Sequence, residues 1–212
     1  MTDDLVFYTN PMSRGRIVRW MLEEVGVPYR TEILDYATTM KAPTYRAINP
    51  MLKVPAIVHG DAVVTETAAI CTYLADAFPE AGLAPQPGSR DRAPYFRWLF
   101  FAASCVETAI TNKSLGFEPP PERHAMVGYG SLAETIDALE AAVTGREFIA
   151  GNRFSAADVY VGAQIGWGMA FGSIDKRPAF IAYSAPLFTR PAAVRAREID
   201  DELLPEEMRG KM

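Results

Sequence analysis

The chain has 212 residues, 49% of them hydrophobic, so it can bury a substantial core as one large domain or two small ones. Its formal net charge of −5 argues against a nucleic-acid partner and against an anionic membrane, because neither would meet a basic stripe. The acidic start, Met1-Thr2-Asp3-Asp4, has no positive leader region and the longest largely apolar run, residues 98–105, is too short to span a membrane, so we expect a soluble cytoplasmic protein.

The first part of the chain alternates between strand and helix patterns. A strand, a helix, a strand, a short helix, two strands and a helix are predicted over residues 5–9, 13–25, 29–34, 41–48, 54–58, 62–65 and 67–78. Gly26 and Pro28 end the first helix, and Gly60-Asp61 turns between the last two strands. This order is the thioredoxin-like arrangement, so we predict an α/β thioredoxin-like domain over residues 1–80.

A linker separates this part from a helical one. Residues 79–88 hold three prolines and two glycines. Beyond them we find only helical patterns, at about residues 90–113, 122–143, 156–171, 179–188 and 191–203. We therefore predict an all-α helical domain over residues 89–212. Ser155 and Asp158 form a capping box at one helix start, which makes Asp158 structural.

The helix over residues 90–113 is apolar around nearly its whole circumference, so more than one of its sides must be buried. It can meet the first domain on one side and a partner subunit on another. Alternatively, it is the central helix of a monomeric bundle.

The strand pair at residues 54–65 carries groups that fit a small anionic peptide. Pro55 lacks an N–H, and Val54 before it offers a main-chain N–H and C=O to an extended ligand backbone. Thr67 stands at a helix start, where unpaired N–H groups, the helix dipole and its own hydroxyl favour a carboxylate. Glu66 beside it can hold an ammonium group. A γ-glutamyl tripeptide would satisfy all of these groups, although an ordinary hairpin entering a capped helix has the same pattern.

With the 154–159 capping motif and Arg190-Pro191, this pattern resembles the glutathione transferase superfamily over nearly the full chain, in particular its bacterial serine-type or theta-like branch. The resemblance implies a cis peptide bond at Pro55, and pairing of Val54 with the cysteinyl backbone of glutathione. It implies that Glu66 and Thr67 bind the γ-glutamyl end. It also implies glutathione as the cosubstrate and favours a homodimer.

A transferase of this kind needs a thiolate, and the chain offers no convincing one, so the nucleophile must come with glutathione. A free thiol has a pKa of about 8.5, and lowering it by about two units takes roughly 2.7 kcal/mol. Ser13 lies at the first helix start with a hydroxyl that can donate to sulfur, and the serine-type branches carry their catalytic serine at this position. A plain helix cap is the alternative role of Ser13.

Asn10 is the competing donor, because some bacterial members of the family use Thr or Asn just after the first strand. Tyr8 is a third candidate, although strand alternation puts its ring in the core. Arg14 and Arg16 stand at the helix N-terminus, where cations oppose the dipole, and this placement hints at an anionic ligand.

Two lysines are candidates for the far end of the ligand. Lys53 resembles the family residue that pairs with the glycine carboxylate of glutathione, and Lys41 is a weaker second. A solvated lysine is the alternative for either.

The electrophile pocket is expected between the domains. We predict an apolar lining of Met12, Phe101, Cys105, Phe117 and Phe171. These side chains are also what any helical core contains.

Metal chemistry is not expected, because no Cys-x-x-Cys and no cluster of His, Cys or carboxylates has ligand spacing. His59 and His124 each stand alone, as surface histidines usually do. The acidic runs at residues 23–24 and 200–202 are interpreted as solvated helix faces.

The sequence therefore predicts a cytoplasmic, homodimeric glutathione transferase that acts in detoxification by adding glutathione to a small apolar electrophile. Glutathione-dependent reduction of a disulfide or peroxide at the same site is an alternative. A non-catalytic member of the family, serving as a binding module, is another. The presence of Val54, Pro55, Glu66 and Thr67 together favours the enzyme.

Overall fold

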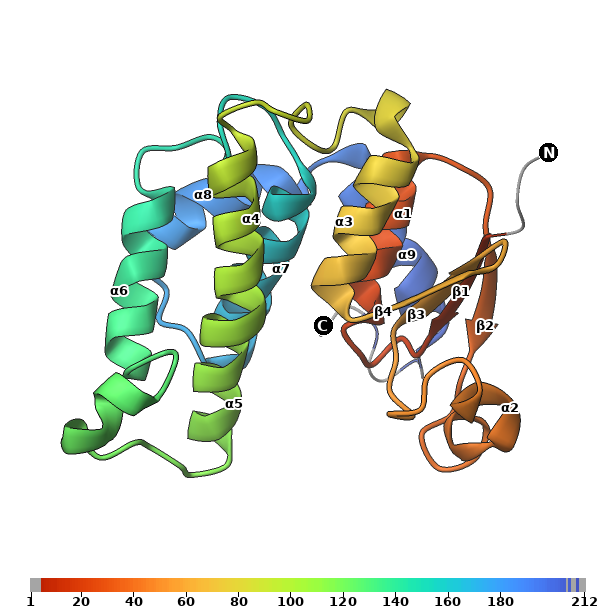
Figure 1. Ribbon diagram of the computed structural model, residues 1–212, viewed down its shortest axis with the longest axis horizontal. Coiled ribbons are helices and arrows are strands. Elements are labelled where there is room, and N and C mark those ends of the chain that lie inside the picture. The colour runs from red at the N-terminus through yellow and green to blue at the C-terminus, as the bar shows by residue number, and fades with distance from the viewer. Residues whose placement is uncertain (1–4, 205, 207–208, 210–212) are drawn as a thin grey trace. The chain divides into compact units, whose positions relative to one another are not determined.

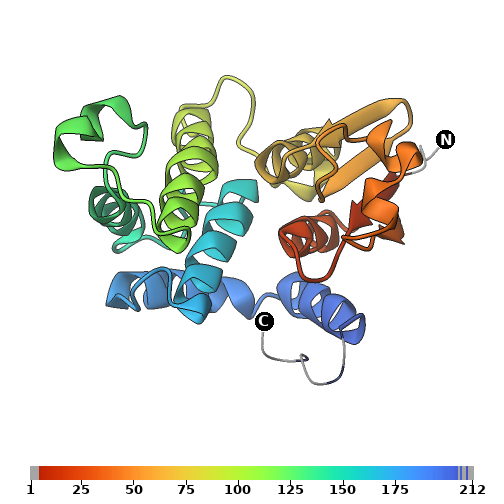
Figure 2. The ribbon, with the colours of Figure 1, turned by 90° about the horizontal axis from the view of Figure 1, so that it is seen from below.

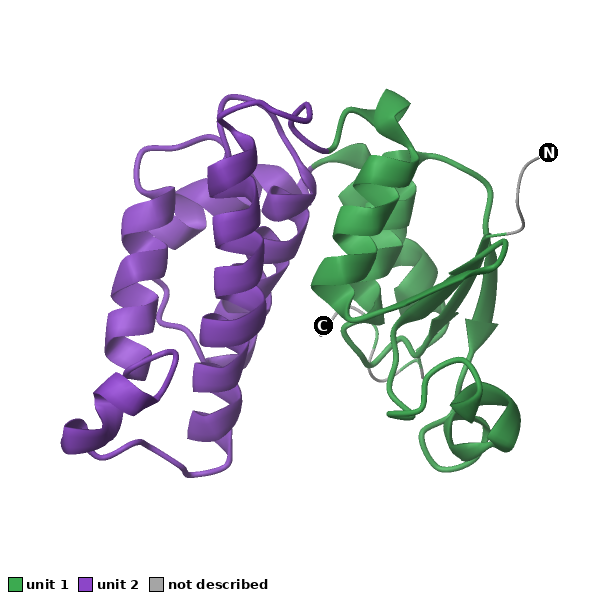
Figure 3. Ribbon diagram, in the orientation of Figure 1, with its two compact units in different colours: residues 1–83, 190–212 green, residues 84–189 purple. Residues whose placement is uncertain are grey.

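The computed structural model describes residues 5–204, 206 and 209. The chain forms two compact units, one of residues 1–83 and 190–212 and one of residues 84–189 (Figure 3). The expected division put residues 89–212 in a single helical domain. The C-terminal segment therefore groups differently in the structure, with the first unit instead of the second.

The first unit is built on a four-stranded mixed sheet with the strand order β2-β1-β3-β4 (Figure 1). The strands are β1 (Leu5–Thr9), β2 (Arg30–Ile33), β3 (Ala56–His59) and β4 (Ala62–Thr65). β1 runs parallel to β2 and antiparallel to β3, which runs antiparallel to β4. The helices of this unit are α1 (Gly15–Val25), α2 (Pro43–Arg46), α3 (Thr67–Ala77) and α9 (Pro191–Glu202). The predicted thioredoxin-like arrangement is confirmed.

Successive residues of β1 face opposite sides of the sheet. Phe7 is fully buried on the side of α1, where the Arg19 guanidinium carbon lies 5.0 Å from its ring centroid. Tyr8 points to the other side and packs against the buried cluster of Leu34, Met40, Tyr45 and Ala56, with its ring centroid 5.7 Å from that of Tyr45 in α2. Strand alternation thus places the Tyr8 ring in a packed layer, as expected.

α1 and α9 lie side by side and are joined by ion pairs (Figures 1 and 2). The most buried pair is Arg19 with Asp200, whose side chains are 2% and 1% exposed and whose Nε and Oδ1 atoms are 3.1 Å apart. Three further pairs join the two segments: Arg16–Asp201, Glu24–Arg190 and Glu23–Arg195. The expectation of solvated acidic faces was wrong for residues 23, 24, 200 and 201, because α9 returns to α1 and pairs these carboxylates with arginines.

Every regular element of residues 84–189 is a helix, as predicted (Figure 1). The helices are α4 (Arg92–Phe101), α5 (Glu107–Ser114), α6 (Leu132–Val143), α7 (Ala156–Phe171) and α8 (Pro178–Phe188). A π-helical turn, Ala102–Val106, joins α4 to α5, so the helix predicted over residues 90–113 is nearly continuous.

The helix predicted over residues 122–143 is wrong in its first part. Residues Pro121–Met126 form a 3-10 helix, and α6 begins only at Leu132. Gly130 between them has a φ of 65°, a conformation that favours glycine. Ser131 then caps α6 through a capping box with Glu134, whose N–H donates to the Ser131 hydroxyl oxygen at 3.2 Å. This cap fixes where the helix begins.

α7 begins with the predicted capping box. The Asp158 carboxylate accepts hydrogen bonds from the Ser155 N–H at 2.9 Å, the Ile149 N–H at 2.8 Å and the Tyr183 hydroxyl at 2.8 Å. Burial raises the pKa of Asp158, while these donors act in the opposite direction. Asp158 therefore ties the start of α7 to the preceding loop and to α8, which confirms its structural role.

Candidate functional site

Four segments of the first unit leave the sheet at the same end of its strands. Tyr8 of β1 is opposite Ala56 of β3, which is opposite Thr65 of β4. At the end of β1, Thr9 is opposite Ile33 of β2. The loop after β1, the turn before β3, the residues after β4 and the loop after β2 therefore emerge together. These segments carry most of the predicted site residues.

The Ser13 hydroxyl lies in the loop between β1 and α1, two residues before the helix begins at Gly15. Its oxygen accepts the Gly15 N–H at 2.9 Å, and its proton goes to the Asn10 carbonyl oxygen at 2.7 Å. The Ser13 N–H donates to the same carbonyl at 3.0 Å. Ser13 is half-buried, so its hydroxyl is held at the helix start without being sealed from a ligand.

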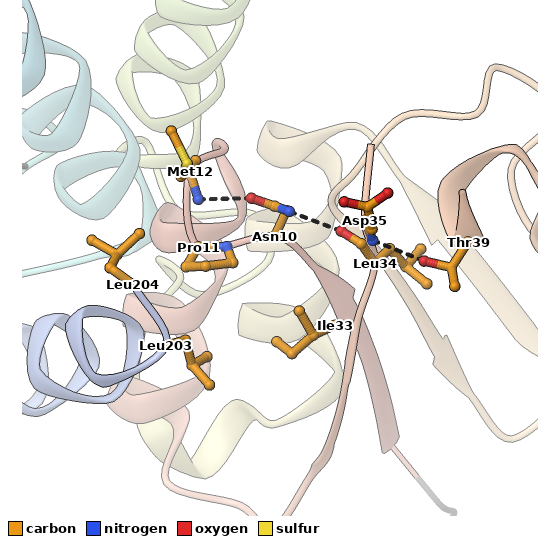
Figure 4. A pocket seen from close by; sticks show the side chains of 9 residues that line it. All are labelled: Asn10, Pro11, Met12, Ile33, Leu34, Asp35, Thr39, Leu203 and Leu204. Atoms are coloured by element: carbon orange, nitrogen blue, oxygen red, sulfur yellow. Dashed lines mark hydrogen bonds between the residues drawn. The ribbon is translucent and has the colours of Figure 1, made fainter. Parts of the chain in front are cut away.

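Asn10 is tied at both ends of its amide (Figure 4). Its Nδ2 donates to the Leu34 carbonyl oxygen at 2.8 Å, and its Oδ1 accepts the Met12 N–H at 2.9 Å. The side chain therefore joins the loop after β1 to the end of β2. Asn10 and Ser13 both remain predictions for the donor to the thiol.

Arg16 braces the same loop from the other side. Its Nε donates to the Pro11 carbonyl oxygen at 2.6 Å and its Nη2 to the Asp201 carboxylate at 2.8 Å, with the side chain only 8% exposed. The expectation that Arg16 marks an anionic ligand was wrong, because its guanidinium is committed to the loop carbonyl and to Asp201. Arg14 is the exposed N-cap residue of α1.

The turn before β3 contains the expected cis peptide bond, between Val54 and Pro55. Two donors fix the turn through the Lys53 carbonyl oxygen, the Tyr45 hydroxyl at 2.6 Å and the Asn49 Nδ2 at 2.8 Å. Strand pairing of β3 starts at Ala56, so the main chain of Val54 lies ahead of the ladder. Pairing of Val54 with an extended ligand backbone stays a prediction.

α3 begins at Thr67, as predicted, with Glu66 as its N-cap residue. Thr67 is buried and Glu66 is exposed, and Glu66 has a φ of 69°, which is unusual for a residue with a β-carbon. The first bond of the helix runs from the Ile70 N–H to the Glu66 carbonyl at 2.8 Å, so the N–H groups before Ile70 are available at the helix start. Strained backbone of this kind clusters at binding and active sites.

Lys53 and Lys41 are both exposed, Lys53 beside the turn before β3 and Lys41 at the end of a 3-10 helix, Thr39–Lys41. Neither forms an ion pair with another residue in the part of the chain that the structure describes. Both remain predictions for the ligand carboxylate.

A pocket of about 350 Å³ opens beside the loop after β1 (Figure 4). Met12, which is 48% exposed, lines it together with Asn10, and the role of Met12 in an electrophile pocket stays a prediction. The remaining lining comes from the end of β2, the following loop and the C-terminal segment: Pro11, Ile33, Leu34, Asp35, Thr39, Leu203 and Leu204. Its mostly apolar lining fits an apolar ligand.

The other predicted pocket residues belong to the second unit. Phe101 and Cys105 are half-buried at the junction of α4 and the π-helical turn, and the Cys105 thiol lies 3.5 Å from the Gly128 carbonyl oxygen. Phe117 and Phe171 are 54% and 62% exposed. Their assignment to an electrophile pocket stays a prediction.

The loop after β2 holds functional candidates that the sequence reasoning missed. The Tyr36 hydroxyl donates to the Met12 carbonyl oxygen at 3.2 Å. Asp35 organises the loop, because its Oδ1 accepts the Ala37 and Thr38 N–H groups, each at 2.9 Å. The Thr38 hydroxyl, which also donates to this carboxylate, and then these two N–H groups lower the pKa of Asp35. The Asp-x-x-Thr pattern was the available signal, since Asp and Thr favour such turns.

Cys71 is fully buried, and burial raises the pKa of its thiol to about 12, so it does not supply a thiolate. Among the described residues there is no group of three or more His, Cys, Asp or Glu side chains that could hold a metal ion. No helix in the described part of the chain is both long enough and apolar enough to cross a membrane.

Residues 12–77 match the family model for the N-terminal domain of glutathione S-transferases. A glutathione S-transferase GST-4.5 of Xanthomonas campestris is 27% identical over 174 residues, which cover 78% of this chain and 83% of the relative.

Solved structures agree over nearly the whole chain. A sphingomonad glutathione S-transferase, complexed with glutathione, is 31% identical with a TM-score of 0.75, covering 92% of this chain and 98% of the other. A glutathione transferase of Methylococcus capsulatus is 29% identical with a TM-score of 0.76, covering 94% of this chain and all of the other.

Proposed function

This chain belongs to the glutathione transferase superfamily and is a glutathione transferase with glutathione as its cosubstrate, and from that premise we propose that Ser13 activates the thiol. The observation that carries the proposal is the hydrogen bonding of the Ser13 hydroxyl. Its oxygen accepts the Gly15 N–H, which holds the hydroxyl in place and makes it a stronger donor. In the structure the hydroxyl donates its proton to the Asn10 carbonyl oxygen. That oxygen still accepts the Ser13 N–H when the hydroxyl turns to sulfur.

The proposed glutathione site uses the other segments that emerge at the same end of the strands. The main chain of Val54 beside Pro55 pairs with the cysteinyl backbone. The Glu66 carboxylate holds the γ-glutamyl ammonium group, and the Thr67 hydroxyl with the N-terminus of α3 holds the γ-glutamyl carboxylate. Lys53, with Lys41 as a second, pairs with the glycine carboxylate at the far end. The exposure of Glu66 and of both lysines supports this assignment.

The proposed reaction begins with loss of the glutathione thiol proton to solvent. The Ser13 hydroxyl and the start of α1 stabilise the thiolate, which then attacks a small apolar electrophile. We place the electrophile against Met12, in the apolar pocket of about 350 Å³. The products are a thioether of glutathione and the electrophile's leaving group. Where the thiolate adds across a double bond, the product is a thioether adduct whose carbanion takes up a proton from solvent.

We further propose a detoxifying enzyme of the bacterial serine-type branch, working in the cytoplasm as a homodimer. The serine at residue 13 supports the branch. Both cysteines are free thiols, which suits a reducing compartment. Phe96 and Phe100 on α4 are 37% and 68% exposed, and a partner subunit would cover them. Light scattering of Phe100→Glu against the native chain tests the dimer. A charge at a position that the partner subunit covers would dissociate it.

The test of Ser13 is the ultraviolet absorbance of glutathione thiolate bound to the protein, titrated against pH. Native protein is expected to lower the thiol pKa by about two units from its free value of about 8.5. Ser13→Ala should lose most of this shift, and Ser13→Thr, which keeps a hydroxyl, should lose less.

If Ser13→Ala leaves the bound thiol pKa unchanged, the donor is not Ser13, and Asn10→Ala becomes the next variant to titrate. If glutathione does not bind, the proposed contacts of Val54, Glu66 and Thr67 are wrong.

A further inference from the structure

The loop after β2 brings a second hydroxyl to the peptide bond that precedes Ser13. β2 ends beside β1, and the Leu34 N–H donates to the Thr9 carbonyl oxygen at 2.8 Å, so the loops that follow the two strands start together. From this loop the Tyr36 hydroxyl reaches the Met12 carbonyl oxygen at 3.2 Å. That carbonyl belongs to the peptide bond between Met12 and Ser13.

The turn that presents Tyr36 is firmly built. The Asp35 carboxylate accepts the Ala37 and Thr38 N–H groups and the Thr38 hydroxyl, the last at 2.8 Å. The Asp35 N–H donates to the Thr39 hydroxyl at 2.8 Å, and the loop continues into Met40, which is 1% exposed. A side chain carried on such a turn is pre-organised, although Tyr36 itself is 47% exposed.

We propose that Tyr36 is a positioning residue for Ser13, whose hydroxyl oxygen accepts the Tyr36 proton while Ser13 donates to the glutathione sulfur. This inference rests on the proposed role of Ser13. It adds a chain of two hydroxyl groups that ends at the thiolate. Each member of such a chain polarises the next, so Tyr36 makes Ser13 a stronger donor without touching the ligand.

The existing contacts permit this rearrangement at small cost. When Ser13 turns to the sulfur, the Asn10 carbonyl keeps the Ser13 N–H at 3.0 Å. When Tyr36 turns to Ser13, its former acceptor is in Met12, a residue exposed enough for water to replace the bond. Partial burial raises the pKa of Tyr36, and hydrogen bonding from Ser13 together with the Arg14 charge acts to lower it. The geometric basis of the proposal is the Tyr36 hydroxyl at the Met12 carbonyl oxygen, one peptide bond from Ser13.

The test is a cycle of four proteins: native, Ser13→Ala, Tyr36→Phe and the double variant. The pKa of glutathione thiol bound to each is measured from the thiolate absorbance. Tyr36→Phe should raise this pKa by about half a unit in the native background, a quarter of the two-unit shift assigned to Ser13. It should have no effect in the Ser13→Ala background, because the chain to sulfur is already broken there.

Two outcomes would overturn the inference while leaving the role of Ser13 intact: no shift from Tyr36→Phe in the native background, or an equal shift in both backgrounds. The second would mean that Tyr36 contacts sulfur directly. An unchanged pKa in Ser13→Ala would instead overturn the proposed function itself.

Controls separate positioning from loop damage. Tyr36→Phe keeps the ring, so the KM for glutathione and the melting temperature should stay at native values while the thiol pKa moves. Tyr73→Phe is the matched control, since the Tyr73 hydroxyl forms a hydrogen bond of 2.9 Å with His59 Nδ1 and is not part of the proposed site. A bound thiol pKa that rises as much in Tyr73→Phe as in Tyr36→Phe would also overturn the inference.

Discussion

Gly15 approaches Thr9 so closely that a β-carbon at Gly15 would lie 1.9 Å from the Thr9 hydroxyl oxygen and 3.0 Å from that of Ser13. Thr9 is fully buried, so neither residue can easily move away. The first turn of α1 therefore requires glycine at this position for reasons of space.

Gly15→Ala should accordingly disturb the site. We expect a loss of about 1–3 kcal/mol in the free energy of unfolding through overpacking, together with a fall in kcat as the Ser13 hydroxyl shifts. Urea unfolding and steady-state kinetics measure the two effects. Gly128→Ala is the control, because no atom lies near its β-carbon position and its φ is not positive. Equal behaviour of the two variants would contradict the steric argument.

Removing one partner of the buried pair of Arg19 and Asp200 should strongly destabilise the protein. Arg19→Met or Asp200→Leu leaves the other charge buried alone, and each should lower the free energy of unfolding by about 3–5 kcal/mol. The double variant should be more stable than either single one, because no lone charge remains. Denaturant unfolding of the four proteins gives the coupling. Additive losses in the double variant would show that the two side chains do not act as a pair.

Tyr183→Phe tests the anchoring of α7. The variant removes the donor at 2.8 Å from the Asp158 carboxylate without changing the ring. Because this hydrogen bond joins a buried carboxylate, we expect a loss of about 1.5–3 kcal/mol in the free energy of unfolding. In an Asp158→Asn background, Tyr183→Phe should lower the free energy of unfolding by less. A loss of the same size in both backgrounds would mean that the carboxylate charge does not matter to Tyr183.

Glu66 allows backbone strain to be separated from ligand binding. Its φ of 69° suits glycine, so Glu66→Gly should be more stable than Glu66→Ala by about 1 kcal/mol. Both variants lack the carboxylate, and both should bind glutathione more weakly to a similar degree. Thermal unfolding and calorimetric titration give the two quantities. Stronger glutathione binding by either variant than by the native protein would contradict the proposed ammonium contact.

Asp35 should make the loop after β2 sensitive to acid. Its folded pKa is lowered below the ordinary value of 3.8, chiefly by the Thr38 hydroxyl and then by the Ala37 and Thr38 N–H groups. A lowered pKa contributes stability that is present above about 3.8 and is lost as the pH falls through the folded pKa. The stability difference between native protein and Asp35→Asn should therefore shrink below this value. Urea titrations between about pH 6 and 3 measure it, and a difference that grows on acidification would reverse the sign.

Local patterns in the sequence predicted much of the fold. The order of strands and helices in the first unit follows from hydrophobic periodicity and from breakers such as Gly26 and Pro28. The Ser155 and Asp158 capping box was also predictable, because all of its partners except Ile149 and Tyr183 lie within one helical turn. The missed start of α6 had a signal of the same kind, Ser131 followed by Glu134.

Contacts between segments that are distant in the sequence could not be predicted from local sequence patterns. The two acidic runs at residues 23–24 and 200–202 each have the composition of a surface, and only the return of α9 to α1 buries Asp200. Arg16 was misjudged for the same reason, since Asp201 is 185 positions away. Tyr36 was missed because its neighbour Met12 comes from the adjacent loop, and strand pairing alone brings the two together.

The position of α9 also bears on how the protein is made. Arg19 is translated before its partner Asp200, which is separated from it by 181 positions. The helical unit of residues 84–189 is translated between them and is complete before the older unit acquires its last helix. During synthesis the thioredoxin-like unit therefore lacks the ion-pair partner of Arg19 until α9 has been translated, and it gains that buried contact only after the helical unit has been made.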